Sequence, residues 1–432
     1  MTWFNHKKQP SANVPVILAL CSLVSVTTPH APAQQVPGSK DADSTWLDLP
    51  TGKQLGVVPG NPQRLNSLPM SMAVTPDSRY VVTVNAGYGT FESRYEQSLA
   101  VMDTQTGTVV DFPDDRTDLR LKQTLYSGLA FNKDGRHLYA SMASLTEPVG
   151  DGKTSTGNGV IVYRFTEGRI SEERLIPVPL QVLAGSRRTR LIGGSENTLG
   201  VPFPAAIALI GGAGDERMLV ADNLSDNAVV LNTVTGKVEQ RFDLSESDTV
   251  PGTYPIALAV SKDGTRAYVA LWNASEVVEL DLKRGVVGRK LALLKPADPV
   301  KPGTHPCSLQ MSPDKNTLYV ALANRDAVAA VDVERGAFKV QSYFDTRLPG
   351  QSYFGAEPDA LAVSADGERL YVADMGSNAV AVIDTRKKSS PAAREGMIEP
   401  IGFIPTEWMP TALAMAGGTH EQLYVATAKA RS

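Results

Sequence analysis

The sequence predicts an all-β protein: a seven-bladed β-propeller made of four-stranded antiparallel blades. The stretch from Tyr254 to Leu293 holds four short strand patterns separated by turn signals, and four antiparallel strands in about 40 residues are typical of one blade. The same unit recurs, each copy beginning at a proline, and the spacings between successive prolines are 51, 51, 52 and 52 residues (Pro204, Pro255, Pro306, Pro358 and Pro410). A fixed period of this length indicates repeats that bury their faces against one another.

Two further copies lie upstream and bring the number of inner hairpins to seven. They begin at Leu68 and Leu125, and Tyr126 stands where the other copies have proline. The last copy has only two strand patterns before the sequence ends. The segment Trp46 to Val58 carries Asp48-x-x-Thr51-Gly52, which matches the turns between third and fourth strands at Asp103 and Asn232. We therefore expect residues 45–432 to form the propeller, with the N-terminal strand closing the last blade and removing an open sheet edge.

The first 33 residues have the pattern of a secretory signal, followed by a polar leader over residues 34–44. Lys7 and Lys8 precede an apolar run from Val14 to Val26 that is too short to span a bilayer, and Ala31-Pro32-Ala33 is an A-x-A-type cleavage site. An uncleaved anchor and lipidation of Cys21 are the alternatives, and Leu20 argues against lipidation. The pattern predicts an exported protein, periplasmic or extracellular in a bacterium, without a membrane span once the signal is removed.

Composition agrees with this class and excludes some partners. Without Lys7 and Lys8 the chain keeps 40 basic and 46 acidic residues, a net charge of −6, so no basic footprint for nucleic acid is present. Cys307 is then the one cysteine left, which rules out an intramolecular disulfide.

Four insertions interrupt the repeat. They are Tyr88–Gln97, Leu145–Asn158, Pro177–Val201 and Lys387–Glu399. Long loops on a regular scaffold often carry function, although decoration without function is the plain alternative. The third insertion holds Arg187, Arg188 and Arg190 as candidate ligand-binding residues. The fourth is hydrophilic and has no chemical signature.

One group of residues could do chemistry, at the mouth of the central channel. The residues that precede the inner strands are Leu68, Leu125, Phe203, Tyr254, His305, Glu357 and Met409, and Cys307 and Asp359 follow two of them. We select Phe203, Tyr254, His305, Glu357, Asp359 and Met409 as candidate ligand-binding residues. His305, Cys307, Glu357 and Asp359 would form a metal or acid–base site if they converge; a water-filled polar mouth is the alternative.

No other motif points to catalysis. His137 and His420 sit in predicted surface turns, and the chain has no G-x-S-x-G, H-E-x-x-H, P-loop or paired C-x-x-C motif. The sequence therefore assigns no catalytic residue, no metal and no cofactor.

Three repeats carry Tyr-Val-Ala before a polar turn, at Tyr319, Tyr371 and Tyr424, followed in the first two by A-V-x-x-x-D. This resembles the YVTN-type repeat of seven-bladed, YncE-like propellers of exported bacterial proteins, and the resemblance covers about residues 45 to 430. The stretch Gly402 to Ala412 is similar to the last blade of proteins in which such a propeller precedes an alkaline-phosphatase-type phosphoesterase domain. No position here matches that enzyme's metal ligands or nucleophile.

A propeller scaffold does not by itself define a function. Our leading expectation is a monomeric, non-catalytic module that binds a small ligand or a protein partner, such as a phosphoesterase domain or chain. The alternatives are a lactonase-like hydrolase with its site at the channel mouth, which the resemblance to other seven-bladed propellers implies, and a structural protein of the cell surface.

Overall fold

The computed structural model describes residues 47–48, 54–55, 58–60, 63, 65, 68–87, 97–114, 123–150, 156–192, 197–210, 217–298, 301–391, 393–418 and 421–429. Residues 45–432 form one unit, and all described residues belong to it. The predicted signal and leader, the first insertion up to residue 96, and His420 lie outside the described residues. None of the described helices is long and apolar enough to cross a membrane.

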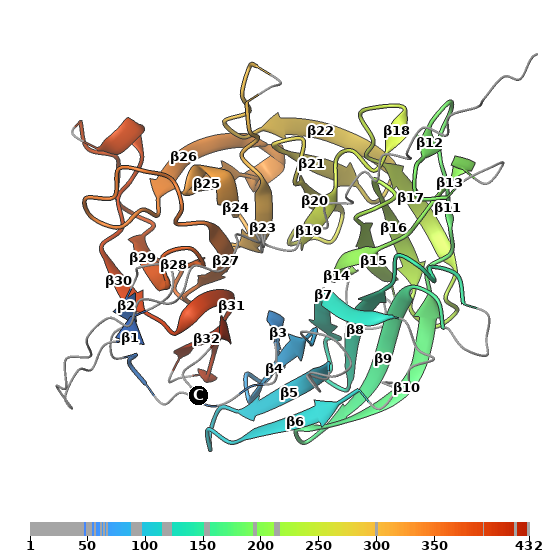
Figure 1. Cartoon of the computed structure of the whole chain (residues 1–432), viewed down its shortest axis with the longest axis horizontal. Helices are drawn as coiled ribbons and strands as arrows, with labels where there is room; N and C mark the ends of the chain where they lie inside the picture. Colours follow the sequence, from blue (N-terminus) through green and yellow to red (C-terminus); the bar gives the residue numbers. More distant parts are fainter. Residues whose placement is uncertain are drawn as a thin grey trace, which may run out of the picture. The chain divides into compact units, whose positions relative to one another are not determined.

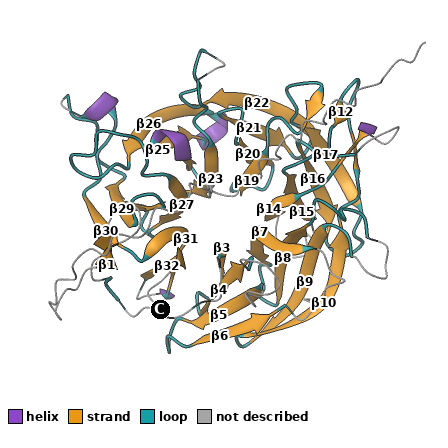
Figure 2. Ribbon diagram, in the orientation of Figure 1, coloured by secondary structure: helices purple, strands orange, loops and turns teal. Residues whose placement is uncertain are grey.

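Six four-stranded antiparallel sheets form the blades, and a two-stranded sheet follows them (Figures 1 and 2). Blade 1 contains β3 (Pro69–Val74), β4 (Tyr80–Asn85), β5 (Ser98–Asp103) and β6 (Val109–Pro113), and blade 2 contains β7 (Thr124–Phe131), β8 (His137–Ala143), β9 (Gly159–Thr166) and β10 (Arg169–Pro177). Blade 3 contains β14 (Pro204–Ile210), β15 (Arg217–Asp222), β16 (Asn227–Asn232) and β17 (Val238–Asp243), and blade 4 contains β19 (Pro255–Val260), β20 (Arg266–Leu271), β21 (Glu276–Asp281) and β22 (Val286–Ala292). Blade 5 contains β23 (Pro306–Met311), β24 (Thr317–Leu322), β25 (Ala327–Asp332) and β26 (Lys339–Asp345), and blade 6 contains β27 (Pro358–Val363), β28 (Arg369–Asp374), β29 (Ala379–Asp384) and β30 (Gly402–Pro405). Blade 7 contains β31 (Trp408–Ala416) and β32 (Gln422–Lys429).

Short elements complete the structure. β11 (Gln181–Val182) pairs with β13 (Leu199–Gly200), and β12 (Arg188–Thr189) pairs in parallel with β18 (Thr249–Val250). Three 3-10 helices, η3 (Ala323–Arg325), η4 (Glu334–Gly336) and η5 (Arg394–Gly396), lie in turns of blades 5 and 6.

The inner strands β3, β7, β14, β19, β23, β27 and β31 are neighbours in that order, and β31 in turn lies beside β3. The hydroxyl of Thr411 in β31 donates a hydrogen bond to the carbonyl oxygen of Pro69 in β3, at 2.7 Å. The ring of blades is therefore closed by its inner strands.

The predicted seventh four-stranded blade is two-stranded in the described residues. β1 (Leu47–Asp48) and β2 (Gln54–Leu55) lie in the N-terminal segment, and they pair with each other in a sheet of their own rather than with β32. The predicted turn at Thr51-Gly52 lies outside the described residues, which form six complete four-stranded blades instead of seven.

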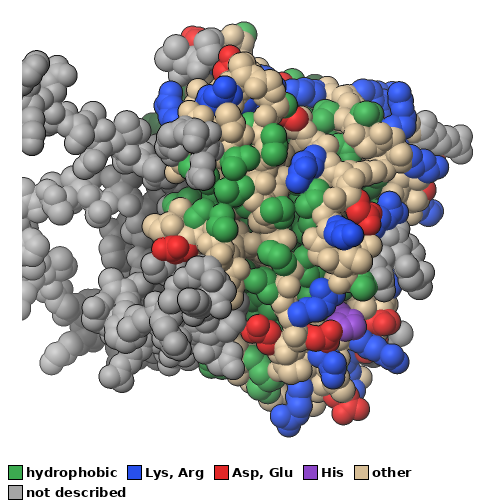
Figure 3. Space-filling view, turned by 90° about the vertical axis from the view of Figure 1, so that its right-hand side faces the viewer, with side chains coloured by type: hydrophobic (Ala, Val, Ile, Leu, Met, Phe, Trp, Pro, Cys, Tyr) green, Lys and Arg blue, Asp and Glu red, His purple; other side chains and the backbone are tan. Residues whose placement is uncertain are grey.

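Each pair of neighbouring blades encloses its own hydrophobic cluster. Between blades 4 and 5, Tyr268 of β20 packs with Leu318 and Val320 of β24, and all three are fully buried. The second and third strands of blades 1 to 6 are mostly buried on both faces, which explains their near-continuous Val, Ala and Leu content. The outer strands are mostly exposed, and on the side shown in Figure 3 basic and acidic side chains are interspersed.

The turns between the first and second strands share a hydrogen-bonded motif. In blade 4, the Ser261 hydroxyl donates to Asp263 at 2.7 Å, and the backbone N–H of Thr265 donates to the same carboxylate at 3.1 Å. The hydrogen bond from Ser261 is the main reason why the pKa of Asp263 falls to about 2. We call the side of the ring with these turns the hairpin face, and the opposite side, where the chain enters the inner strands, the mouth face.

Candidate functional site

The predicted equivalence of the mouth residues is visible in the backbone. Five residues that precede an inner-strand proline have left-handed φ angles between 51° and 62° (Leu68, Tyr254, His305, Glu357 and Met409). Such angles are uncommon outside glycine and persist where the surroundings enforce them. Leu125 and Phe203 occupy the same repeat position without a positive φ, and both side chains are buried.

Side chains from the preceding blade hold these mouth loops. The carboxylate of Asp226 accepts hydrogen bonds from the backbone N–H groups of Gly252, Thr253 and Tyr254, at 2.6 to 3.1 Å. Asp326 accepts the equivalent three bonds, at 2.8 to 3.1 Å, from residues 355–357.

Smaller polar groups do the same in two other blades. Ser275 accepts one backbone bond from Thr304, and Asn378 accepts one from Met409. All four residues lie in turns between second and third strands, and all four have positive φ. Their hydrogen bonds hold the backbone at the positions from which the mouth side chains extend.

A second set of contacts joins the inner strands around the ring. Cys307 and Thr411 are the bulged residues of β23 and β31, and each points at the carbonyl oxygen of the proline that begins the next inner strand. The Cys307 thiol donates to Pro358 at 3.1 Å, as Thr411 does to Pro69. The hydroxyl of Ser71 donates to the Ser127 carbonyl and that of Ser127 to the Ala205 carbonyl, both at 2.6 Å. Cys307 therefore has a structural role between blades 5 and 6.

Aromatic rings line the mouth from blade 2 to blade 5, and we call Tyr126, Phe203, Tyr254, Trp272 and His305 the aromatic belt. Tyr126 meets Phe203 edge to face at 5.2 Å between ring centroids, and Tyr254 packs against the same cluster. Tyr254 meets Trp272 edge to face at 6.3 Å. The Trp272 and His305 rings are stacked at 3.7 Å with an angle of 25° between them. The belt is continuous, and Tyr254, Trp272 and His305 keep part of their surface exposed.

Blade 6 supplies two carboxyl groups to the same face. Glu357 is exposed, and Asp359 is the bulged residue of β27 with a partly exposed side chain. Burial among protein atoms raises the pKa of Asp359 to about 6, and the negative charge of Glu357 adds to this rise. Burial lowers the pKa of His305, so its imidazole is neutral near pH 7.

The structure brings the sequence-selected residues together in part. Glu357 and Asp359 interact electrostatically, and the thiol of Cys307 reaches the backbone between them. His305 has its ring against Trp272, and no hydrogen bond or ion pair to either carboxyl group is found in the described part of the chain. Within the described residues no three His, Cys, Asp or Glu side chains form a cluster that could hold a metal ion. Met409 is the second residue of β31, and its N–H donates to the Asn378 side chain.

The arginines of the third insertion differ in their roles. Arg187 forms an ion pair with Asp243 at 3.1 Å and so ties the insertion to blade 3. Arg188 and Arg190 are exposed. Leu191, next in sequence, packs against the cluster of Phe203, Leu224 and Tyr254, so this insertion reaches the aromatic belt.

The fourth insertion, which lacked a chemical signature, is anchored by ion pairs. Glu395 pairs with Arg325 at 2.6 Å and with Arg347 at 3.5 Å, and Arg394 pairs with Asp345 at 3.4 Å. The buried Arg347 also binds Asp345 at 2.8 Å. Residues 394–398 thus lie beside the mouth loop of blade 6.

That loop carries two exposed aromatic residues. The side chains of Tyr353 and Phe354 are 83% and 51% exposed. The guanidinium groups of Arg325 and Arg347 lie 5.1 and 5.3 Å from the centre of the Phe354 ring. Cation–π contacts on an exposed ring hold it in place without covering it.

Sequence reasoning missed Asp226, Ser275, Asp326, Asn378 and Trp272. The first four had a usable signal, because a short polar residue stands in each turn immediately before the third strand of the blade. Trp272 has no counterpart in the other repeats, so the repeat pattern alone could not select it.

Comparisons with known proteins agree with the fold. An uncharacterized YncE protein of Salmonella typhi is 27% identical over 158 residues, which is 36% of this chain and 38% of that protein, so the matched part is little more than a third of the relative's length. A periplasmic gluconolactonase of Pseudomonas aeruginosa superposes with a TM-score of 0.55 at 17% identity, covering 88% of this chain and 93% of that chain. The hydrazine synthase of Kuenenia stuttgartiensis superposes with a TM-score of 0.53 at 13% identity, covering 87% of this chain and 100% of that chain. At such identities these structures show the fold alone.

The family comparison is broader. The family described as SMP-30/Gluconolactonase/LRE-like region matches residues 184–429, more than half of the chain and all of blades 3 to 7. The chain is therefore a β-propeller that belongs to the SMP-30/gluconolactonase/LRE-like family.

Proposed function

We propose that the mouth face binds a small molecule that presents an apolar ring face on one side and hydroxyl groups on the other. The observation that carries this proposal is the continuous aromatic belt on the same face as Glu357 and Asp359. Aromatic rings supply area for stacking at low entropic cost, and carboxylates accept hydrogen bonds from hydroxyl groups. The rigid mouth loops, held by Asp226 and Asp326, keep both groups in place without the ligand.

The binding test uses the fluorescence of Trp272. Titration of the full chain with a slowly hydrolysing sugar lactone, such as a 1,4-lactone, should change the tryptophan emission in a saturable way. Trp272→Ala should abolish that change, and Trp408→Phe is the matched control that keeps Trp272. A response that survives Trp272→Ala and disappears in Trp408→Phe would place the ligand away from the belt and contradict the proposal.

The second candidate is hydrolysis of a lactone at this mouth. Two observations favour it: the family match and the pKa of Asp359 near 6. In the reaction, the Asp359 carboxylate takes a proton from water as the water oxygen attacks the lactone carbonyl carbon. The ring C–O bond then breaks, and the ring oxygen takes the proton back from Asp359, which gives the open hydroxy acid. A base with this pKa is mostly ionised at pH 7 and close enough to neutrality to return the proton.

A pH-stat assay separates hydrolysis from binding. The wild-type rate with a sugar lactone, after subtraction of the solvent rate, should rise with an apparent pKa near 6 and fall at least about 100-fold in Asp359→Asn. Glu357→Gln should lower the midpoint of the pH profile, because the Glu357 charge contributes to the raised pKa of Asp359. If no rate exceeds the solvent rate while lactone still quenches Trp272, the mouth binds without catalysis.

A protein partner is the third possibility, and one feature favours it. The chain resembles the propeller half of exported proteins with a phosphoesterase domain, and Tyr353 and Phe354 form an exposed aromatic pair on the mouth face. In this proposal, a phosphoesterase domain covers that aromatic pair. The chain meets this domain outside the cytoplasm, after export. Purified chain should retain such a domain at micromolar concentration, and Tyr353→Ser with Phe354→Ser should release it. Equal retention by both forms would disprove a role for this loop.

A further inference from the structure

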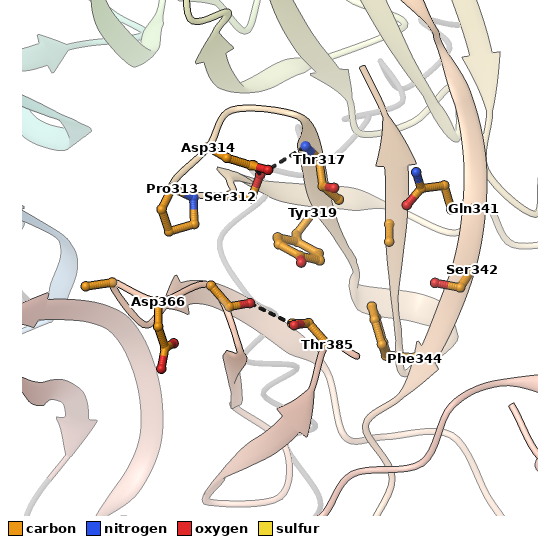
Figure 4. Close-up of a pocket in the computed structure, with 13 residues that line it drawn as sticks. Ser312, Pro313, Asp314, Thr317, Tyr319, Gln341, Ser342, Phe344, Asp366 and Thr385 are labelled. Carbon is orange, nitrogen blue, oxygen red and sulfur yellow. Dashed lines mark hydrogen bonds between the residues drawn. The ribbon is translucent and has the colours of Figure 1, made fainter. Parts of the chain in front are cut away.

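The groove between blades 5 and 6 on the hairpin face holds a cavity of about 450 Å³. It lies away from the mouth residues, because its lining comes from the turns and outer strands at the other end of the blades. Figure 4 shows Tyr319 at its centre, with Gln341, Ser342 and Phe344 on one side and Asp366 and Thr385 on the other. The volume is in the range typical of small-molecule pockets.

The equivalent groove between blades 4 and 5 is filled by side chains. Comparing the two grooves explains why the one between blades 5 and 6 holds a cavity. There, Glu279 binds Arg266 at 3.3 Å and Arg289 at 2.7 Å, and these three residues form what we call the ion cluster. Phe338 of blade 5 stacks on Tyr268 at 5.7 Å, and Arg289 lies 5.2 Å above the Phe338 ring. Side chains therefore occupy the whole space above the tyrosine of the second strand.

Each of these side chains is replaced by a smaller one at the next groove. Arg266 and Thr317 are both the first residue of a second strand, and Glu279 and Ala330 are both the fourth residue of a third strand. Ser342 pairs with Ala330 across the sheet, where Arg289 lies beside Glu279 in blade 4. Thr317, Ala330 and Ser342 all line the cavity.

The stacking ring is missing as well. Phe338 follows a short turn after the third strand of blade 5, whereas in blade 6 the insertion Lys387–Glu399 stands in place of that turn. Part of this insertion crosses to the outer strand of blade 5, where Ile398 forms a bridge with Phe344. Among the described residues of blade 6, no aromatic ring stacks on Tyr319, which is 5% exposed and borders the cavity.

The lining indicates the chemistry of a ligand. Four hydroxyl groups (Ser312, Thr317, Ser342 and Thr385), the amide of Gln341 and the Tyr319 ring face the cavity, and no Lys, Arg or His is among its lining residues. Asp314 and Asp366 are ionised because hydrogen bonds from Ser312 and Ser364 lower their pKa values. Asp366 accepts the bond from Ser364 at 2.6 Å on one oxygen, whereas Asp314 uses both oxygens within its own turn, accepting from Ser312 at 2.5 Å and from the Asn316 amide at 3.0 Å. Lys262 acts on Asp314, and Arg369 and Arg386 act on Asp366, from outside the lining. The lining itself presents two carboxylates to an anion, and its remaining groups are neutral donors and acceptors.

We propose that this cavity is a second binding site, for a small neutral molecule rich in hydroxyl groups, such as a monosaccharide. The proposal is independent of the function proposed for the mouth face, because the two sites share no residue. Without an ion cluster or a stacking ring above it, this groove keeps a polar cavity of suitable size in the described part of the molecule.

Isothermal titration calorimetry with the full chain tests the site, with glucose as the probe. A ligand of this size is expected to bind with a Kd on the order of 1 mM. Gluconate, which carries a negative charge, should bind at least about 10-fold more weakly, since the lining offers it no cation. Thr317→Arg with Ala330→Glu and Ser342→Arg rebuilds the ion cluster in this groove and should remove glucose binding.

Two further variants make the result decisive. Ser342→Arg alone fills the cavity with one change and should also weaken binding at least about 10-fold, in case the triple variant does not fold. Val286→Arg is the matched control, because it adds the same side chain to an exposed position of an outer strand. Absence of saturable heat, or equal binding by Ser342→Arg and Val286→Arg, would overturn the proposal.

Discussion

Replacement of Asp359 by Asn tests how this carboxyl group is held at the mouth. Asp359 occupies the bulge position at which Cys307 and Thr411 donate to a proline carbonyl of the next blade. An ionised carboxylate has no proton to donate there, and burial with the charge of Glu357 raises its pKa from 3.8 to about 6. Because the folded pKa exceeds the unfolded one, the folded chain binds more protons between pH 3.8 and 6. The stability that Asp359 contributes is therefore complete below pH 3.8 and is lost as the pH rises through 6.

The size of the effect follows from the shift. A difference of 2.2 pKa units corresponds to about 3 kcal/mol at pH 8, which is an upper value because solvent reaches part of the side chain. Asp359→Asn stays neutral and keeps a donor, so it should unfold at higher urea than the wild type at pH 8 and at nearly the same urea at pH 4. Urea denaturation between pH 4 and pH 8 measures this difference. Asp366→Asn, in a hairpin-face turn where the pKa is lowered, is the control and should not stabilise at pH 8. A free energy difference between Asp359→Asn and wild type that does not change with pH would refute the reasoning.

Three other predictions concern the scaffold. Asp326→Ala leaves the N–H groups of Gly355, Ala356 and Glu357 without their acceptor and should lower the free energy of unfolding by about 2 to 4 kcal/mol in urea denaturation, with Asp326→Asn in between. Thr411→Val removes the hydrogen bond between the last and first inner strands and should lower it by about 1 kcal/mol, seen as a lower Tm than in the neighbouring surface variant Thr427→Val. Ser261→Ala removes the main cause of the low pKa of Asp263; the stability from that group is present above pH 3.8 and lost as pH falls through about 2. The Ser261 hydroxyl also accepts a hydrogen bond from the Arg266 N–H, and the loss of that bond does not depend on pH. The variant should therefore lose up to about 1 kcal/mol more at pH 6 than at pH 2, and an equal loss at both pH values would contradict this assignment.

The fold was predictable because the repeat constrains it in several independent ways. The prolines before the inner strands, the hairpin turns and the buried second strands all recur at the same spacing, and each is required locally by backbone geometry. The set of mouth residues followed from that alignment. The pairing of β1 with β2 did not, because a short hairpin satisfies itself and the sequence contains nothing that selects between it and the edge of β32.

Contacts between blades were harder to predict than the blades themselves. The stack of Trp272 on His305 joins a turn of blade 4 to the mouth loop of blade 5, and no period in the sequence links these two positions. The same holds for Glu395, which reaches Arg325 across 70 residues from within an insertion. Such contacts depend on how adjacent blades are oriented, which is a property of the packed ring rather than of any one repeat.

Departures from the repeat therefore mark the candidate sites better than the repeat does. The bulge residues on either side of blade 6 serve the scaffold, since Cys307 and Thr411 each donate a hydrogen bond to the next inner strand. Asp359 stands at the same bulge position, but its side chain loses its hydrogen-bond donor when the carboxyl group ionises. Ionisation therefore destabilises the ring of blades and leaves a titrating carboxyl group at the mouth. Thr317, Ala330 and Ser342 line a groove that stays open where the ion cluster fills the preceding one. A carboxyl group that lowers stability when it ionises is expected where binding or catalysis requires its charge, and an open groove where a ligand requires the space, so these two sets of residues are the ones to substitute first.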